Sequence, residues 1–277
     1  MTNEAPDNPP SAEEWKKVYD EAARFRAIAP WGWMCDSDLF GVKNPADGEI
    51  GYCCVLGAVE EVFGLVVYLG REGLEGYRRV KNFGQFESPD DILHVQKNLS
   101  LTFNDRSDLQ KEDLQRIQEI GLKFNGRNAW PFFRSYRPGY FPWHLTSEEA
   151  RFLALCLGQA NETVLRFKKD PDLFKVSGDG RYFVRVRDDA PGGGWKDARP
   201  EPASMRKVTI VTQDMDPRRL ERVQEVSPRT KMTWEADMFY TPAVIHEKNK
   251  RPYFPAAVMF VDSESNFILN AAYSEAG

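Results

Sequence analysis

The segment from Lys123 to His144 has the most distinctive chemistry in the sequence. Its 22 residues read KFNGRNAWPFFRSYRPGYFPWH and include eight aromatic residues, four basic residues and no acidic residue. Guanidinium groups bind phosphate and carboxylate through paired hydrogen bonds, and aromatic rings stack on bases and cations. This combination predicts a site for an anionic ligand or partner.

Six residues of this segment are candidate ligand-binding residues. Three arginines would hold the anion, and three aromatic rings would stack on the rest of the ligand. They are Arg127, Arg134 and Arg137, with Trp130, Tyr136 and Tyr140. Because the segment also contains three prolines, it cannot form a long helix, and we expect a loop. A structural interpretation competes with this one, since arginines also stack on aromatic rings where no ligand binds.

A second set of candidates consists of the carboxylates Asp36, Asp38 and Glu49. Asp36 and Asp38 are two residues apart in a predicted strand, so they would project from one face of it. Carboxylates that share a face can hold Mg²⁺ or Ca²⁺, or act as an acid–base pair. A metal-assisted hydrolase is therefore the alternative to a non-enzymatic binding module, and a solvated strand face is the structural interpretation.

No other motif indicates catalysis. The three histidines, His94, His144 and His246, lack the spacing of a zinc enzyme, and Gly192–Gly194 lacks the residues of a phosphate-binding loop. We therefore expect no cofactor. Whether the chain is an enzyme stays open, as does a third role as a protein-interaction scaffold with the aromatic segment as part of its core.

Composition limits the partners. The chain has 277 residues, with 37 basic and 42 acidic side chains and a net charge of −5. A protein that coats nucleic acid would usually be strongly basic, so nucleic acid is not favoured. The longest apolar runs are far shorter than the roughly 20 residues of a membrane helix. A nucleotide, an anionic small molecule or a protein remains as the expected partner.

The cysteines and the N-terminus indicate a cytoplasmic protein. Residues 1–11 are polar and acidic, without the features of a secretory signal, and we expect a disordered tail. The four cysteines contain no Cys-x-x-Cys motif, which favours free thiols in a reducing compartment. A disulfide between Cys35 and Cys54 stays open, because pairing depends on geometry.

The elements that must position these residues can be predicted from capping and periodicity. Capping boxes at Ser11–Glu14 and Thr146–Glu149 start two long helices, the second over about 147–168. Strand patterns at about 33–42, 50–56 and 62–69 have short connections, which favours an antiparallel meander. Further helices are expected near 74–77, from Ser88-Pro89 with an apolar stripe that includes Leu99, and over about 112–120.

The chain changes character near residue 170. Strand patterns follow at 181–187, 207–212 and 234–240, a short basic helix begins at Asp216-Pro217, and a terminal hairpin is expected from 256–261 and 266–272. We predict an N-terminal domain over 12–170 and a smaller C-terminal domain over 171–277. Runs of strands and runs of helices favour an α+β fold, with an antiparallel strand meander followed by a smaller mixed domain.

Three stretches of the sequence are familiar as a set: residues 29–42, 51–57 and 126–143. They read APWGWMCDSDLFGV, GYCCVLG and GRNAWPFFRSYRPGYFPW. Together they resemble an uncharacterised bacterial family built from two domains of unknown function. The resemblance covers residues 12–170 well and the C-terminal part more loosely. It implies a two-domain bacterial protein and assigns no catalytic residue.

Overall fold

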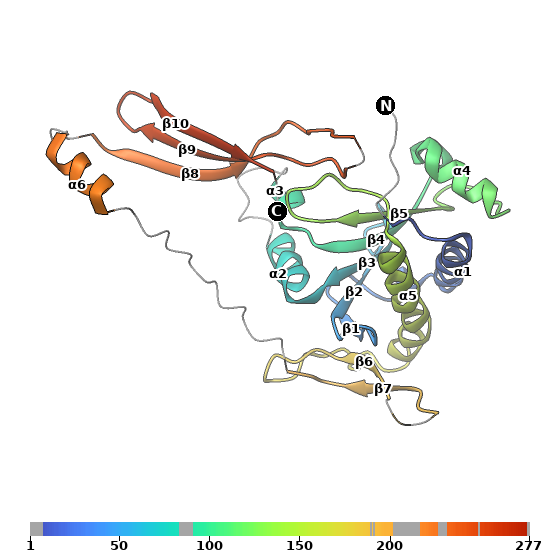
Figure 1. Cartoon of the computed structure of the whole chain (residues 1–277). Helices are drawn as coiled ribbons and strands as arrows, with labels where there is room; N and C mark the ends of the chain where they lie inside the picture. The colour runs from blue at the N-terminus through green and yellow to red at the C-terminus, as the bar shows by residue number, and fades with distance from the viewer. Residues whose placement is uncertain are drawn as a thin grey trace.

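The computed structural model describes residues 8–82, 91–188, 190, 192–201, 217–226, 232–248 and 250–275. Within these ranges the chain forms a seven-stranded sheet with helices on both faces, and a separate three-stranded sheet near the C-terminus (Figure 1). The predicted α+β class is confirmed. The predicted strand at 207–212 and the helix start at Ser88-Pro89 lie outside the described residues.

The larger sheet has the strand order β5-β4-β3-β2-β1-β6-β7. Its strands are β1 (Phe40–Lys43), β2 (Ile50–Leu56), β3 (Phe63–Leu69), β4 (Asn98–Asn104), β5 (Trp130–Tyr136), β6 (Val184–Arg187) and β7 (Trp195–Ala198). Neighbouring strands are antiparallel except for β1 and β6, which are parallel. The predicted antiparallel meander is confirmed, and β4 and β5 extend it.

Two predicted elements have different bounds in the structure. The first strand begins only at Phe40, because the residues before it form a turn in which the backbone N–H of Cys35 donates to Asp38 Oδ2 at 2.8 Å. Leu99 does not belong to a helix stripe. The helix α3 ends at Val95, and Leu99 lies in β4, which pairs with strands on both sides.

The predicted loop at 123–144 contains a strand. Residues Trp130–Tyr136 form β5 at one edge of the larger sheet and pair with β4 over their whole length. Pro131 lacks a backbone N–H and is tolerated because β5 is an edge strand. The three prolines do exclude a long helix here, but they do not exclude an edge strand.

Helices cover both faces of the larger sheet (Figure 1). The helix α1 (Ala12–Ile28) packs against α5 (Ser147–Phe167), and both contribute to the main core. Ser11 and Thr146 cap these helices through complete capping boxes, as predicted. The helix α2 (Gly70–Lys81) packs on the opposite face. Two further helices in the described chain are α3 (Asp91–Val95) and α4 (Lys111–Glu119).

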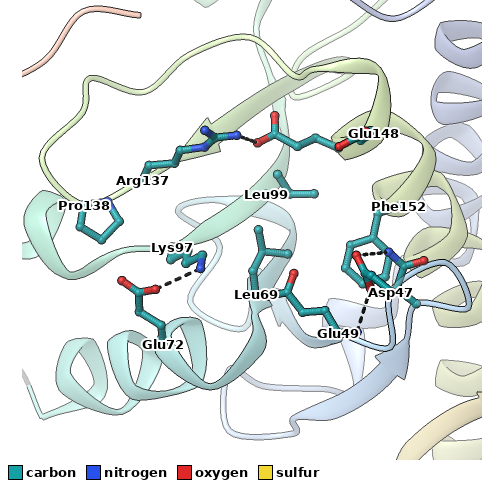
Figure 2. A pocket seen from close by; sticks show the side chains of 12 residues that line it. Asp47, Glu49, Leu69, Glu72, Lys97, Leu99, Arg137, Pro138, Glu148 and Phe152 are labelled. Atoms are coloured by element: carbon teal, nitrogen blue, oxygen red, sulfur yellow. Dashed lines mark hydrogen bonds and ion pairs between the residues drawn. The ribbon is translucent and has the colours of Figure 1, made fainter. Parts of the chain in front are cut away.

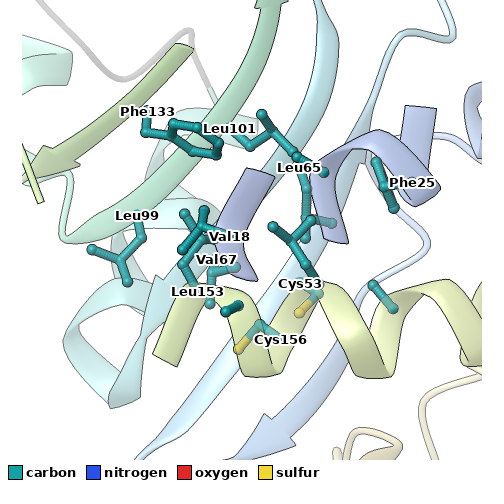
Figure 3. Packing of buried hydrophobic residues seen from close by; sticks show 14 of the residues in the cluster. Val18, Phe25, Cys53, Leu65, Val67, Leu99, Leu101, Phe133, Leu153 and Cys156 are labelled. Atoms are coloured by element: carbon teal, nitrogen blue, oxygen red, sulfur yellow. The ribbon is translucent and has the colours of Figure 1, made fainter. Parts of the chain in front are cut away.

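Strand alternation divides the core into two clusters. In β2, Cys53 faces α1 and α5, whereas its neighbour Cys54 faces α2. Figure 3 shows Cys53 near Cys156 of α5, among the aliphatic side chains of the main core. All four cysteines are free, so the Cys35–Cys54 disulfide is not formed.

The chain beyond residue 170 first completes the larger sheet and then forms the smaller one. The strands β6 and β7 pair with each other, and β6 also pairs with β1. The helix α6 (Pro217–Val226) follows, and then β8 (Trp234–Tyr240), β9 (Ala256–Asp262) and β10 (Ile268–Ser274). The predicted strand at 234–240 and the terminal hairpin are confirmed. No helix in the described chain is long and apolar enough to cross a membrane.

Candidate functional site

The three predicted arginines lie in three different environments. Arg127 is exposed, Arg134 is buried on β5, and Arg137 follows β5 with its side chain 52% exposed. They therefore do not face one shared concavity. Each has to be considered separately as a candidate for ligand binding.

Arg134 belongs to a buried ionic cluster. Its guanidinium donates to both carboxylate oxygens of Asp113, to Gln110 Oε1 and to the backbone oxygen of Phe133. It also lies over the Phe132 ring, 3.8 Å from the ring centroid. Arg116 donates to the same carboxylate at 3.2 Å. These partners occupy Arg134, so its guanidinium holds α4 against β5.

His144 lies beside this cluster and is 5% exposed. Its Nδ1 is 4.0 Å from Asp113 Oδ1 and has no hydrogen-bond partner among the described residues. Burial, with the charges of Arg134 and Arg116, lowers the pKa of His144 to about 4. The imidazole is therefore neutral at physiological pH. The two arginines hold the pKa of Asp113 below its usual range, despite the burial of that carboxylate.

The predicted aromatic residues pack mostly within the protein. Trp130 contacts Phe124 at 5.8 Å between ring centroids, and Arg106 lies over its indole. Tyr136 is half-buried, and burial raises the pKa of its phenol. Tyr140 lies under the guanidinium of Arg251 at 5.7 Å.

The three candidate metal ligands do not share a strand face. Asp36 lies in the turn before β1, where its backbone oxygen accepts from Tyr77 Oη, and Asp38 closes that turn. Glu49 precedes β2 and lies against Gly70 of α2. In the part of the chain that the structure describes, no group of three His, Cys, Asp or Glu side chains is placed to hold a metal ion.

A cavity of about 480 Å³ brings together Glu49 and Arg137 from these two separate predictions (Figure 2). Its walls come from the β1–β2 turn, the end of β3, the start of α2, β4, the chain after β5 and the start of α5. The lining residues are Asn44, Asp47, Glu49, Leu69, Glu72, Lys97, Leu99, Arg137, Pro138, Glu148, Glu149 and Phe152. The volume is within the range of small-molecule sites.

Both basic side chains of this cavity are paired with carboxylates. Lys97 Nζ lies 3.0 Å from Glu72 Oε2, and Arg137 Nη2 lies 2.8 Å from Glu149 Oε1. Glu149 is fixed further by accepting from Ser135 Oγ and from the backbone N–H of Thr146. The lining has five carboxylates and two basic groups, so it is acidic overall.

Of the two partly buried carboxylates in the cavity, Glu49 and Glu149, only Glu49 lacks a basic partner among the described residues. It forms no ion pair with any described residue. A Cβ added at Gly70 would lie 2.7 Å from Glu49 Oε1, so this carboxylate lies close to the Gly70 backbone. Gly70 has a φ of +58°. Burial, together with the charges of Asp47 and Glu72, raises the pKa of Glu49, and Lys97 offsets this only in part. A cation in the cavity would stabilise the charged form of Glu49.

Arg251 is a functional candidate that the sequence did not indicate. Its guanidinium donates to the backbone oxygens of Ser135 and Phe141 and to Ser135 Oγ. It forms no ion pair with a described carboxylate, and burial together with the charge of Arg137 lowers the pKa of Arg251 to about 10. Arg251 follows β8 in a region without a motif, so only the fold reveals that it lies near Arg137.

The comparisons with known proteins find two domains of unknown function in the chain, as the resemblance noted from the sequence implies. Residues 219–276 match a family model described as "Domain of unknown function (DUF6930)". The comparisons with curated proteins and with solved structures give no match. Residues 15–185, which contain the whole cavity lining, match a second model. The chain therefore belongs to the family described as "Domain of unknown function (DUF7309)".

Proposed function

We propose that this protein is a non-enzymatic binding module whose cavity takes a small organic cation with an aliphatic chain and an ammonium or guanidinium head. The observation that carries the proposal is Glu49, a half-buried carboxylate that forms no ion pair among the described residues. A ligand cation would supply the missing partner and form a charge-assisted hydrogen bond.

The rest of the cavity supports this ligand class. Leu69, Leu99 and Phe152 provide an apolar wall for methylene groups. In Figure 2, Leu69 and Leu99 lie in the middle of the view, with Arg137 and the Lys97–Glu72 pair on one side and Phe152 and Glu49 on the other. Because Lys97 and Arg137 already have carboxylate partners, an anionic ligand would have to displace one of these partners.

A calorimetric titration with matched probes tests the charge preference. Butylamine and butylguanidine have the same chain as butyrate but carry the opposite charge. We expect the two cations to bind and butyrate not to bind. Glu49→Gln should weaken cation binding by at least about tenfold, the size of one charge-assisted hydrogen bond. Glu61→Gln, at an exposed turn outside the cavity, is the matched control. Equal binding of butyrate and butylamine would refute the proposal.

A second candidate function is anion binding near Tyr140, as the Arg-rich segment suggested. It is favoured by the proximity of Arg137 and Arg251. Of these two arginines, only Arg137 forms an ion pair with a described residue, which is Glu149. Two guanidiniums with one carboxylate leave a net positive charge beside an aromatic ring. Under this candidate, inorganic phosphate binds the wild type, and Arg137→Gln abolishes binding while Glu49→Gln does not. No heat of phosphate binding would exclude it.

A further inference from the structure

Within the part of the chain that the structure describes, the three-stranded sheet ends in an unprotected edge. Its order is β10-β9-β8, so β10 has a described partner strand on one side only. All seven residues of β10 are exposed, and they include apolar side chains such as Ile268, 52% exposed, and Tyr273, 66% exposed. An edge strand presents unpaired N–H and C=O groups that can pair with another chain.

The residues of β10 lack the usual protection against such pairing. The strand reads ILNAAYS and contains no charged residue, no proline and no glycine. One irregularity in the pairing with β9 lies between Ile268 and Asn270, and the pairing from Asn270 to Ser274 is regular. Natural sheets protect their edges with charged residues, prolines or bulges. Beyond its irregular start, β10 has none of them.

The opposite edge is different. The strand β8 carries two exposed carboxylates, Glu235 and Asp237, which project from the same face. Pairing of β8 with its own copy would bring like charges together, which is unfavourable in a sheet. The charge distribution therefore disfavours association through β8 and permits it through β10.

A second copy of this chain is the partner that fits β10 best. An uncharged strand can pair with its own copy in antiparallel orientation without any contact between like charges. The two-fold arrangement also closes the assembly, because each β10 edge is then used once. The pairing would also enlarge a sheet of only three strands, and small sheets are stabilised by further strands. Apolar residues of this sheet, such as Trp234 at 62% exposed and Met238 at 72%, have little cover within the described chain.

We propose that two copies of this protein associate through antiparallel pairing of β10 with β10, which joins the two small sheets into one six-stranded sheet. This proposal is independent of the ligand in the cavity, because every residue that lines the cavity lies before residue 153.

Sedimentation analysis of the full chain tests the proposal. At high concentration we expect a mass twice the 31.8 kDa of one chain. Asn270→Asp and Ala272→Lys each place a charge on the edge and should raise the dimer dissociation constant by at least about tenfold. Ala236→Lys, an exposed alanine on β8, is the matched control and should leave the dimer unchanged. Circular dichroism melting curves check that each variant folds.

Hydrogen exchange of the wild type gives a second readout that needs no substitution. The β10 amides should become more protected as the dimer forms, and the β8 amides should not. The proposal is overturned if the wild type is a monomer up to its solubility limit. It is also overturned if a dimer persists unchanged in both β10 variants, or if Ala236→Lys dissociates it as strongly as Ala272→Lys.

Discussion

Arg134 binds Asp113 through both terminal nitrogens of its guanidinium, with Nη1–Oδ1 at 3.1 Å and Nη2–Oδ2 at 2.8 Å. Both side chains are less than 5% exposed. The planar guanidinium fits a carboxylate in this two-point geometry. The pair joins α4 to β5, two elements that are separated in the sequence by the chain between Glu119 and Trp130.

Removing the charge of Asp113 should destabilise the protein strongly. Asp113→Asn leaves Arg134 buried without its counter-ion, and Arg116 loses the same partner. We expect the free energy of unfolding to fall by about 3 kcal/mol or more, as for other broken buried pairs. Urea denaturation measures the change. Asp20→Asn, which breaks the exposed pair with Lys16, should cost less than about 1 kcal/mol.

The buried His144 should make stability depend on pH. Its folded pKa is lowered to about 4 from an ordinary value of 6.5, so the unfolded chain binds a proton more readily than the folded one in this window. The free energy of unfolding should therefore decrease as the pH falls from 6.5 to about 4, by on the order of 3 kcal/mol. Above pH 6.5 the His144 imidazole is neutral in both the folded and the unfolded chain, so it no longer makes the free energy of unfolding depend on pH.

Denaturation of a matched pair of variants across this pH range isolates the histidine. His144→Gln should remove most of the decrease, whereas His246→Gln, at an exposed position, should keep it. The folded pKa of Asp113 is lowered from 3.8, so this carboxylate loses its stabilising charge only at a pH below the range in which His144 reduces stability. An unchanged slope in His144→Gln would mean that other groups cause the pH dependence.

Cation binding in the cavity should weaken in acid. The charged form of Glu49 would bind the ligand, and the pKa of Glu49 is raised above 4.5. Butylamine affinity should fall as the pH is lowered from about 7 through this raised pKa. Binding near that pKa should also release a proton, which calorimetry in two buffers of different ionisation enthalpy detects. In Glu49→Gln both effects should disappear.

Close packing at Gly64 should make this position intolerant of a side chain. A Cβ at Gly64 of β3 would lie 2.0 Å from the backbone oxygen of Leu101 in β4. Gly64→Ala must therefore move a strand of the central sheet, and we expect a loss of about 3 kcal/mol, near the top of the range for overpacking. Thermal melting measures this. Gly178→Ala is the control, because a Cβ there meets nothing within 4 Å.

Local signals in the sequence predicted the long helices and the C-terminal hairpin well. The capping boxes at Ser11 and Thr146 and the alternation around 234–240 and 256–272 depend on neighbouring residues, which a sequence displays directly. The strand β5 was missed because the three prolines and the aromatic residues of the segment 123–144 suggested a loop. On an edge, where one side of the strand needs no partner, proline is compatible with pairing.

The cavity could be predicted only in fragments. Glu49 and Arg137 were both candidates, but for different sites and different chemistry. Glu49 precedes β2 and Arg137 follows β5, and β3 and β4 lie between these two strands in the sheet. That both residues line one cavity is therefore a property of the fold. The partners of Arg134 could not be predicted either, since Asp113 was one of many acidic residues that the arginine could have reached.

The parallel pairing of β6 with β1 has a consequence for the order of folding. Gly41 pairs with Val184, so a ribosome must make the meander, α4 and all of α5 before this edge of β1 can be covered. Until then the nascent chain exposes an edge of its central sheet. Contacts between such distant residues form late and slowly. The region around β1 is therefore where we expect a newly made chain to depend most on protection from misassembly.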